Sequence, residues 1–139
     1  MVTTFQFAAN DVDPGGDEVA ILALAGGGHD RVVLTLRRAG AAYHLSLYGR
    51  ENGGALRRVG RVKVPRRRTT RLAIEWAQAS STASSDGVLR LLKKGRARIV
   101  AADLDNGGQV IDELEIGLPN GVISPGAGHF LLDEFLLTP

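Results

Sequence analysis

The segment RVVLTLRRAGAAYHLSLY, residues 31–48, predicts the fold class because apolar and polar side chains alternate along both of its halves. The apolar side chains of this alternation are Val32, Leu34, Leu36, Tyr43, Leu45 and Leu47. A period of two is typical of a β-strand that buries one face and exposes the other. We therefore predict two half-buried strands, over 31–38 and 43–48.

Similar segments separated by glycine-rich turns fill the rest of the chain, and helical periodicity is nearly absent. The ten predicted strands cover residues 2–8, 18–24, 31–38, 43–48, 56–64, 69–77, 88–93, 97–102, 110–118 and 129–137. Within 110–118, the predicted core side holds Val110, Leu114, Ile116 and Leu118, whereas Ile111, Glu113 and Glu115 lie opposite. Short strands with frequent turns predict an all-β fold, an antiparallel sandwich or barrel with essentially no helix.

The size and composition of the chain indicate one globular domain over residues 1–139. Its 44% hydrophobic and 23% charged residues exclude wholesale disorder. The absence of cysteine excludes disulfides, a thiol nucleophile and zinc sites built on Cys. No apolar run approaches the ~20 residues of a membrane span, and no signal-peptide layout is seen, so we expect no membrane insertion. Frequent Ala, Gly and Arg are typical of a GC-rich bacterial source.

The net charge of +2 conceals a strong segregation of charge along the chain. Residues 1–56 carry a net charge of −2, residues 57–98 carry +11, and residues 99–139 carry −7 with no Lys or Arg. Such blocks indicate either a charged partner or a domain that neutralises itself by placing the blocks side by side. Both interpretations remain open at the level of sequence.

Several runs in the second half of the chain carry a family resemblance. They are Arg71-Leu-Ala-Ile-Glu-Trp76, Asp86-Gly-Val-Leu-Arg-Leu91, Lys94-Gly95, Asp105-Asn106, Leu114-Glu-Ile-Gly117 and Gly128-His-Phe-Leu-Leu-Asp-Glu-Phe135. Together they resemble concanavalin A-like lectin/glucanase domains of the laminin G-like kind. The resemblance covers roughly residues 69–137 and, more faintly, the chain from Phe5 onward. It implies a jelly-roll sandwich of two antiparallel sheets whose first and last strands lie together.

The same resemblance implies carbohydrate or cell-surface ligands and an extracellular or cell-surface location, and calcium is common in this family. Two features depart from the family pattern. The hairpin that usually carries Asp-Gly reads Lys94-Gly95 here, so an acidic surface position has become basic. The chain also starts almost at the strand that holds Phe5, where such domains often have an earlier strand. A trimmed domain and one module of a longer protein both fit this start.

The strongest surface signal is the basic stretch from Arg57 to Arg71. Our candidate ligand-binding residues there are Arg57, Arg61, Lys63, Arg66, Arg67, Arg68 and Arg71. With Val62 and Val64 inward, we expect the first three on the opposite face and the three consecutive arginines in the following turn. Guanidinium groups bind oxyanions bidentately, which favours an acidic polysaccharide or an acidic protein surface. Specific nucleic-acid binding is not favoured because stacking aromatics are few. A solvated basic edge that prevents aggregation is the alternative.

Three oxygen-bearing side chains lie in and beside one loop, namely Asp103, Asp105 and Asn106. Such groups suit a hard cation, so we predict a calcium site here. The following Gly107-Gly108 explains the stretch equally well as a hairpin turn. The three histidines are scattered and lack the spacing of metal ligands.

The remaining carboxylates offer little chemistry. Glu113 and Glu115 share one strand face at about 6.5–7 Å, close to the separation that glycosidases use. The run from Asp112 to Gly117 nevertheless lacks the Glu-x-Asp-x-x-Glu arrangement of the glucanases. By parity we expect Asp112 to point inward, and one member of Asp133-Glu134 to be buried and paired.

These features favour a non-catalytic binding or adhesion module for a carbohydrate or another anionic surface ligand. One alternative is a self-assembling protein in which the basic and acidic blocks of neighbouring copies meet, so a homo-oligomer is among our predictions. Another is a glycoside-cleaving enzyme built on Glu113 and Glu115. We assign no cofactor other than the predicted calcium ion.

Overall fold

The computed structural model describes residues 1–117 and 128–139, and all regular structure in them is β-strand. The ten strands are β1 (Val2–Ala8), β2 (Val19–Gly26), β3 (His29–Ala39), β4 (Ala42–Arg50), β5 (Leu56–Val64), β6 (Thr70–Ala77), β7 (Gly87–Lys93), β8 (Arg96–Leu104), β9 (Glu113–Ile116) and β10 (Leu131–Thr138). Each corresponds to one of the ten predicted strands. None of the described residues forms a helix long and apolar enough to cross a membrane.

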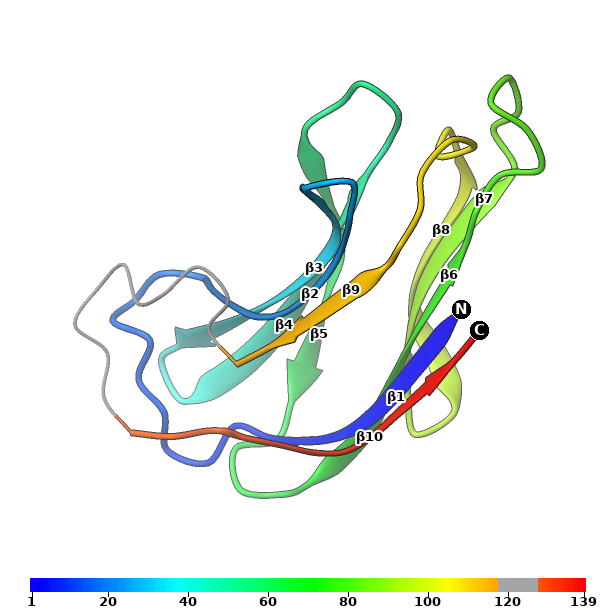
Figure 1. Ribbon diagram of the computed structural model, residues 1–139. Helices are drawn as coiled ribbons and strands as arrows, with labels where there is room; N and C mark the ends of the chain where they lie inside the picture. Colours follow the sequence, from blue (N-terminus) through cyan, green and yellow to red (C-terminus); the bar gives the residue numbers. More distant parts are fainter. Residues whose placement is uncertain (118–127) are drawn as a thin grey trace.

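The strands form two antiparallel five-stranded sheets that pack as a β-sandwich, as Figure 1 shows. One sheet has the order β10-β1-β6-β7-β8, and the other has the order β5-β4-β3-β2-β9. The predicted sandwich is therefore confirmed. The first and last strands, β1 and β10, pair side by side, as the family resemblance implied.

The core lies between the two sheets and consists of the side chains that the alternation placed inward. In β3 and β4, the inward residues from Val32 to Leu47 are fully buried. Phe5, Leu72 and Ile74 face them from the other sheet with no more than 1% exposure. Burying such large side chains contributes about 1.5–3 kcal/mol each relative to exposure, so this layer dominates the stability of the sandwich.

The prediction of which side chains face the core in 110–118 is wrong for the first residues of this segment. Val110 is 58% exposed, Asp112 is exposed, and Ile111 packs against the core instead. The reason is that β9 begins only at Glu113, so no strand alternation governs residues 110–112. Ile116 is 46% exposed because β9 is an edge strand with a neighbour on one side only. Leu118 lies outside the described residues.

The expectation of a buried carboxylate in β10 is also wrong. Asp133 and Glu134 are both exposed. The pairing of β10 with β1 shifts register between Thr4 and Gln6, and Glu134 has a φ of 52°. An extra residue at such a bulge interrupts the alternation, so consecutive side chains need not lie on opposite faces.

Candidate functional site

The register of β5 decides where its basic side chains lie. Leu47 pairs with Gly60 but Tyr48 pairs with Arg58, so a bulge leaves Val59 without a partner in the ladder. On the N-terminal side of the bulge, the alternation between inward and outward side chains is reversed. Arg58 joins the outer face, and the expectation that Arg57 shares that face with Arg61 and Lys63 is wrong.

Five basic residues on the outer face of β3, β4 and β5 form what we call the cationic face. They are Arg37, His44, Arg58, Arg61 and Lys63. His44 pairs in the ladder with Arg37 on one side and with Lys63 on the other. Burial, followed by the charges of Arg61, Lys63 and Arg37, holds the pKa of His44 below its ordinary value of 6.5. The positive potential at this row therefore disfavours any further cation.

Beside the cationic face, a cavity of about 390 Å³ opens at the end of β5, and we call it the cationic pocket. Its described lining consists of Lys63, Val64, Pro65, Arg68, Thr69, Thr70, Lys93 and Lys94. The Nζ of Lys93 donates a hydrogen bond to the main-chain oxygen of Lys63, at 2.7 Å, and so links β7 to β5. Burial, together with the charges of Arg98 and Lys94, lowers the pKa of Lys93.

The described lining of the cationic pocket contains no carboxylate. Nor do its four basic side chains form an ion pair with any acidic residue of the chain, all of which lie in the described part. Thr69 and Thr70 also line the pocket, and the Thr70 hydroxyl donates a hydrogen bond to the main-chain oxygen of Arg68 at 3.5 Å. Several uncompensated cations around one concavity bind an oxyanion through charge-assisted hydrogen bonds, which are stronger than neutral ones. The pocket therefore has the chemistry of a site for sulfate or carboxylate groups.

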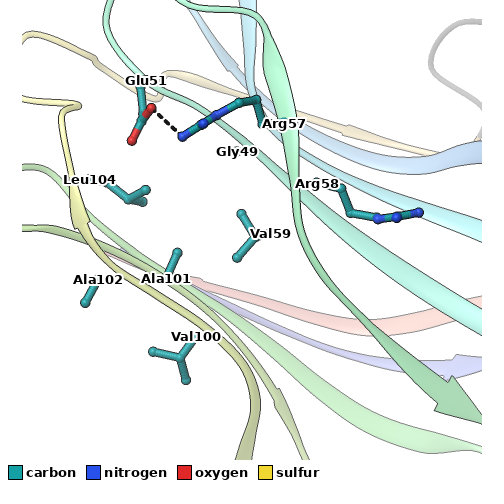
Figure 2. Close-up of a pocket in the computed structure, with 9 residues that line it drawn as sticks. All are labelled: Gly49, Glu51, Arg57, Arg58, Val59, Val100, Ala101, Ala102 and Leu104. Carbon is teal, nitrogen blue, oxygen red and sulfur yellow. Dashed lines mark hydrogen bonds and ion pairs between the residues drawn. The ribbon is translucent and has the colours of Figure 1, made fainter.

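A second cavity of about 370 Å³, shown in Figure 2, lies at the other end of β5 and differs in its charge balance. We call it the mixed pocket because basic Arg57 and Arg58 share it with acidic Glu51. An Arg57 nitrogen lies 2.7 Å from Oε2 of Glu51, and the close-up shows the two side chains pointing toward each other. The preferred counter-ion of Arg57 is thus already in place.

The other predicted basic residues are divided among different parts of the surface. Arg66 and Arg67 both bind Asp11, at 2.7 and 3.1 Å, and their hydrogen bonds hold the pKa of Asp11 below its ordinary value. Arg71 lies on the outer face of β6, which belongs to the other sheet. Only Lys63 and Arg68 of the seven predicted residues line the cationic pocket.

The two lysines that complete the pocket, Lys93 and Lys94, were not among the predicted residues. Lys93 and Lys94 lie about thirty residues beyond Lys63 and reach it because β7 ends beside β5 at this end of the sandwich. A usable signal was present, since the block 57–98 that carries the net charge of +11 includes both lysines.

A carboxylate that sequence analysis also missed balances one cation of the cationic face. Glu18 accepts hydrogen bonds from Ser46 at 2.9 Å, from Thr35 at 3.4 Å and from the Tyr48 hydroxyl. Burial raises the pKa of Glu18, but the hydrogen bonds from Tyr48 and Ser46 and the charge of Arg58 together lower it by more than burial raises it. The pKa of Glu18 therefore lies below its ordinary value of 4.5. Burial and the same carboxylate raise the pKa of Tyr48. The charge of Arg58 is thus partly compensated.

The predicted calcium ligands have contacts with the protein itself. Asn106 is fully buried, and its amide accepts a hydrogen bond from the Ala79 N–H at 2.7 Å and donates one to the Ala77 oxygen at 3.1 Å. Oδ1 of Asp105 accepts a hydrogen bond from Asn52, whereas Asp103 is exposed. The described residues contain no cluster of three or more His, Asp or Glu side chains suited to a metal. Calcium binding at this loop stays a prediction.

Glu113 and Glu115, the residues of the glycosidase alternative, lie on the edge strand β9, opposite Ala25 and Ala23 of β2. Glu113 lines a small cavity of about 100 Å³ with Leu114 and Leu137, but Glu115 is not part of its described lining. The structure therefore does not bring the two carboxylates together in one described cavity. Comparisons with protein families, with curated proteins and with solved structures found no match to this chain.

Proposed function

We propose that this protein is a non-catalytic binding module for an anionic polysaccharide, held at the cationic pocket. One observation carries the proposal. Lys63, Arg68, Lys93 and Lys94 line one cavity whose described lining contains no acid. The neighbouring cationic face extends the positive potential across β5 and β4, which suits a ligand with repeated anionic groups rather than a single ion.

The polysaccharide class is favoured over other polyanions by two features. Few aromatic side chains are available to stack on nucleobases, since the chain has one Trp, two Tyr and four Phe, and Trp76, Tyr43, Phe5 and Phe7 are buried. The resemblance to laminin G-like and concanavalin A-like domains adds a carbohydrate ligand and a jelly-roll topology to the proposal. Sulfated and uronic-acid polysaccharides supply the oxyanions that lysine and arginine bind.

The test measures binding of the purified protein to immobilised heparin, chondroitin sulfate, polygalacturonate and neutral dextran, at low salt and at about 0.15 M salt. Lys63→Gln combined with Arg68→Gln removes two pocket cations. Arg57→Gln combined with Arg90→Gln is the matched control, because it also removes two positive charges, but ones already paired with Glu51 and Glu75.

We expect one class of acidic polysaccharide to bind at physiological salt and the pocket variant to bind it at least tenfold more weakly. Each charge-assisted hydrogen bond contributes about 1.5–3 kcal/mol, and tenfold corresponds to about 1.4 kcal/mol. The control variant should change affinity less than twofold. Equal losses in both variants, or binding that disappears at physiological salt, would overturn the proposal. Stronger binding to polyglutamate than to every polysaccharide would assign the pocket to an acidic protein instead.

Adding calcium or a chelator to the same assay tests the separate prediction at Asp103, Asp105 and Asn106. A requirement for calcium that is lost in Asp103→Asn combined with Asp105→Asn would support it. Binding that is unchanged by chelator would remove calcium from the binding mechanism.

A further inference from the structure

The charge segregation of the sequence becomes a segregation between the two sides of the sandwich. β5 and β8 carry six basic residues and one acidic residue, whereas β9 and β10 carry four acidic residues and no basic one. In the sheet orders, β8 and β10 are the opposite edges of one sheet, and β5 and β9 are the opposite edges of the other. We call β5 with β8 the basic edge and β9 with β10 the acidic edge.

The two strands of each edge lie on the same side of the molecule. β5 and β8 contact each other across the sandwich and together line the mixed pocket (Figure 2). On the opposite side, Leu114 of β9 and Leu137 of β10 line one small cavity. The molecule therefore has one positive long side and one negative long side.

Exposed apolar side chains are concentrated on these same two edges. The large apolar residues that the described part of the chain exposes are Val100, Val110, Ile116, Leu131, Leu136 and Leu137. The first lies on β8, the second just before β9, and the others on β9 and β10. Apolar surface bordered by charged residues is typical of sites that contact another protein.

The carboxylates of the acidic edge are available to a partner. Among the described residues, Glu113, Glu115, Asp133 and Glu134 form no ion pair, and all acids and bases of the chain are described. Glu134 accepts one hydrogen bond from Gln6. Five of the six basic residues on the other edge likewise form no ion pair, Arg57 being the exception.

We propose that copies of this chain associate head to tail, with the acidic edge of one copy against the basic edge of the next. Opposite charges favour the contact between unlike edges, whereas two acidic or two basic edges repel. Charged side chains and the bulge at Glu134 disfavour main-chain pairing of this sheet edge with the same edge of another copy. A contact between two different surfaces extends into an open chain or closes into a ring rather than stopping at a twofold dimer.

The test is a charge exchange followed by sedimentation velocity and light scattering, without any polysaccharide. The acidic-edge variant carries Glu113→Lys, Glu115→Lys and Glu134→Lys. The basic-edge variant carries Arg61→Glu, Arg96→Glu and Arg98→Glu. All six positions lie on edge strands, and circular dichroism verifies that both variants are folded.

The wild-type protein should form species larger than a dimer at low salt, with an average mass that increases with concentration and decreases with added salt. Each variant alone should be monomeric, because its two edges then have the same sign. An equimolar mixture of the two should associate again. A wild-type monomer at low salt, association of either folded variant alone, or a mixture that stays monomeric would overturn the proposal.

This association is independent of the proposed function. The acidic-edge variant keeps all four basic residues of the cationic pocket and all five of the cationic face, so polysaccharide binding by this variant at a monomeric concentration tests the pocket separately.

Discussion

The cationic pocket and the mixed pocket are two openings of nearly equal size, about 390 and 370 Å³, and β5 contributes to the lining of both. They differ in their counter-charges. In the mixed pocket Glu51 lies 2.7 Å from Arg57, whereas the described lining of the cationic pocket holds four bases and no acid. A run of basic residues can therefore offer free cations to an anion only where no carboxylate of the same chain pairs with them.

A carboxylate introduced into the cationic pocket should have the largest effect on polysaccharide binding. Thr69 lines the pocket and is exposed. Thr69→Glu should weaken polysaccharide binding more than tenfold, because the new carboxylate pairs with the neighbouring cations and repels an incoming anion. Affinity for immobilised heparin measures the effect. Thr69→Gln is the matched control of the same size, and an equal loss in that variant would show that shape rather than charge is responsible.

The reverse change should create a weak second site. Glu51→Gln removes the counter-ion of Arg57 and leaves Arg57 as an unpaired cation at the mixed pocket. We expect total affinity for heparin to increase about threefold, because exposed ion pairs contribute about 0.2–1 kcal/mol. Glu75→Gln is the control, since it frees Arg90 on another part of the surface and removes the same charge. No difference between these two variants would contradict the importance of local charge balance.

A smaller effect should come from His44 in the cationic face. Burial and the charges of Arg61, Lys63 and Arg37 lower its pKa, so the unliganded protein resists protonation at this position. A bound polyanion offsets those charges and raises the pKa. Binding should therefore strengthen about twofold between pH 7.5 and 5.5, as His44 takes up a proton on binding.

The same lowered pKa fixes the sign of the effect on stability. The unfolded chain binds this proton more readily than the folded one, so the free energy of unfolding decreases as the pH falls through about 6.5. A bound polyanion should make this decrease in the free energy of unfolding smaller. Titration of heparin binding at the two pH values, with His44→Gln as the comparison, measures the coupling. An unchanged pH dependence in His44→Gln would exclude His44 as its source.

Much of the fold followed from the sequence because strand alternation is a local property. The segments around Val32 and Leu45 bury one face in the structure as their period of two predicted. The prediction failed where something outside the segment acts. Val110 lies in a loop before β9, and the bulge near Glu134 depends on how β10 pairs with β1.

The candidate site was only half predictable for the same reason. Lys63 and Arg68 were found within the basic stretch, but Lys93 and Lys94 join them only because the two sheets bring the end of β7 within reach of the end of β5. Arg58, rather than Arg57, lies on the outer face because of a bulge opposite Leu47 and Tyr48. No property of β5 by itself reveals this bulge.

The all-β class, the ten strands and the basic and acidic blocks could be read from the sequence, because periodicity and charge are carried by neighbouring residues. Which charges remain uncompensated depends on the packing of the two sheets. Asp11 binds Arg66 and Arg67 across more than fifty residues, and Glu51 binds Arg57. An electrostatic site depends on the distances between charges in space, and the packing of the two sheets sets those distances.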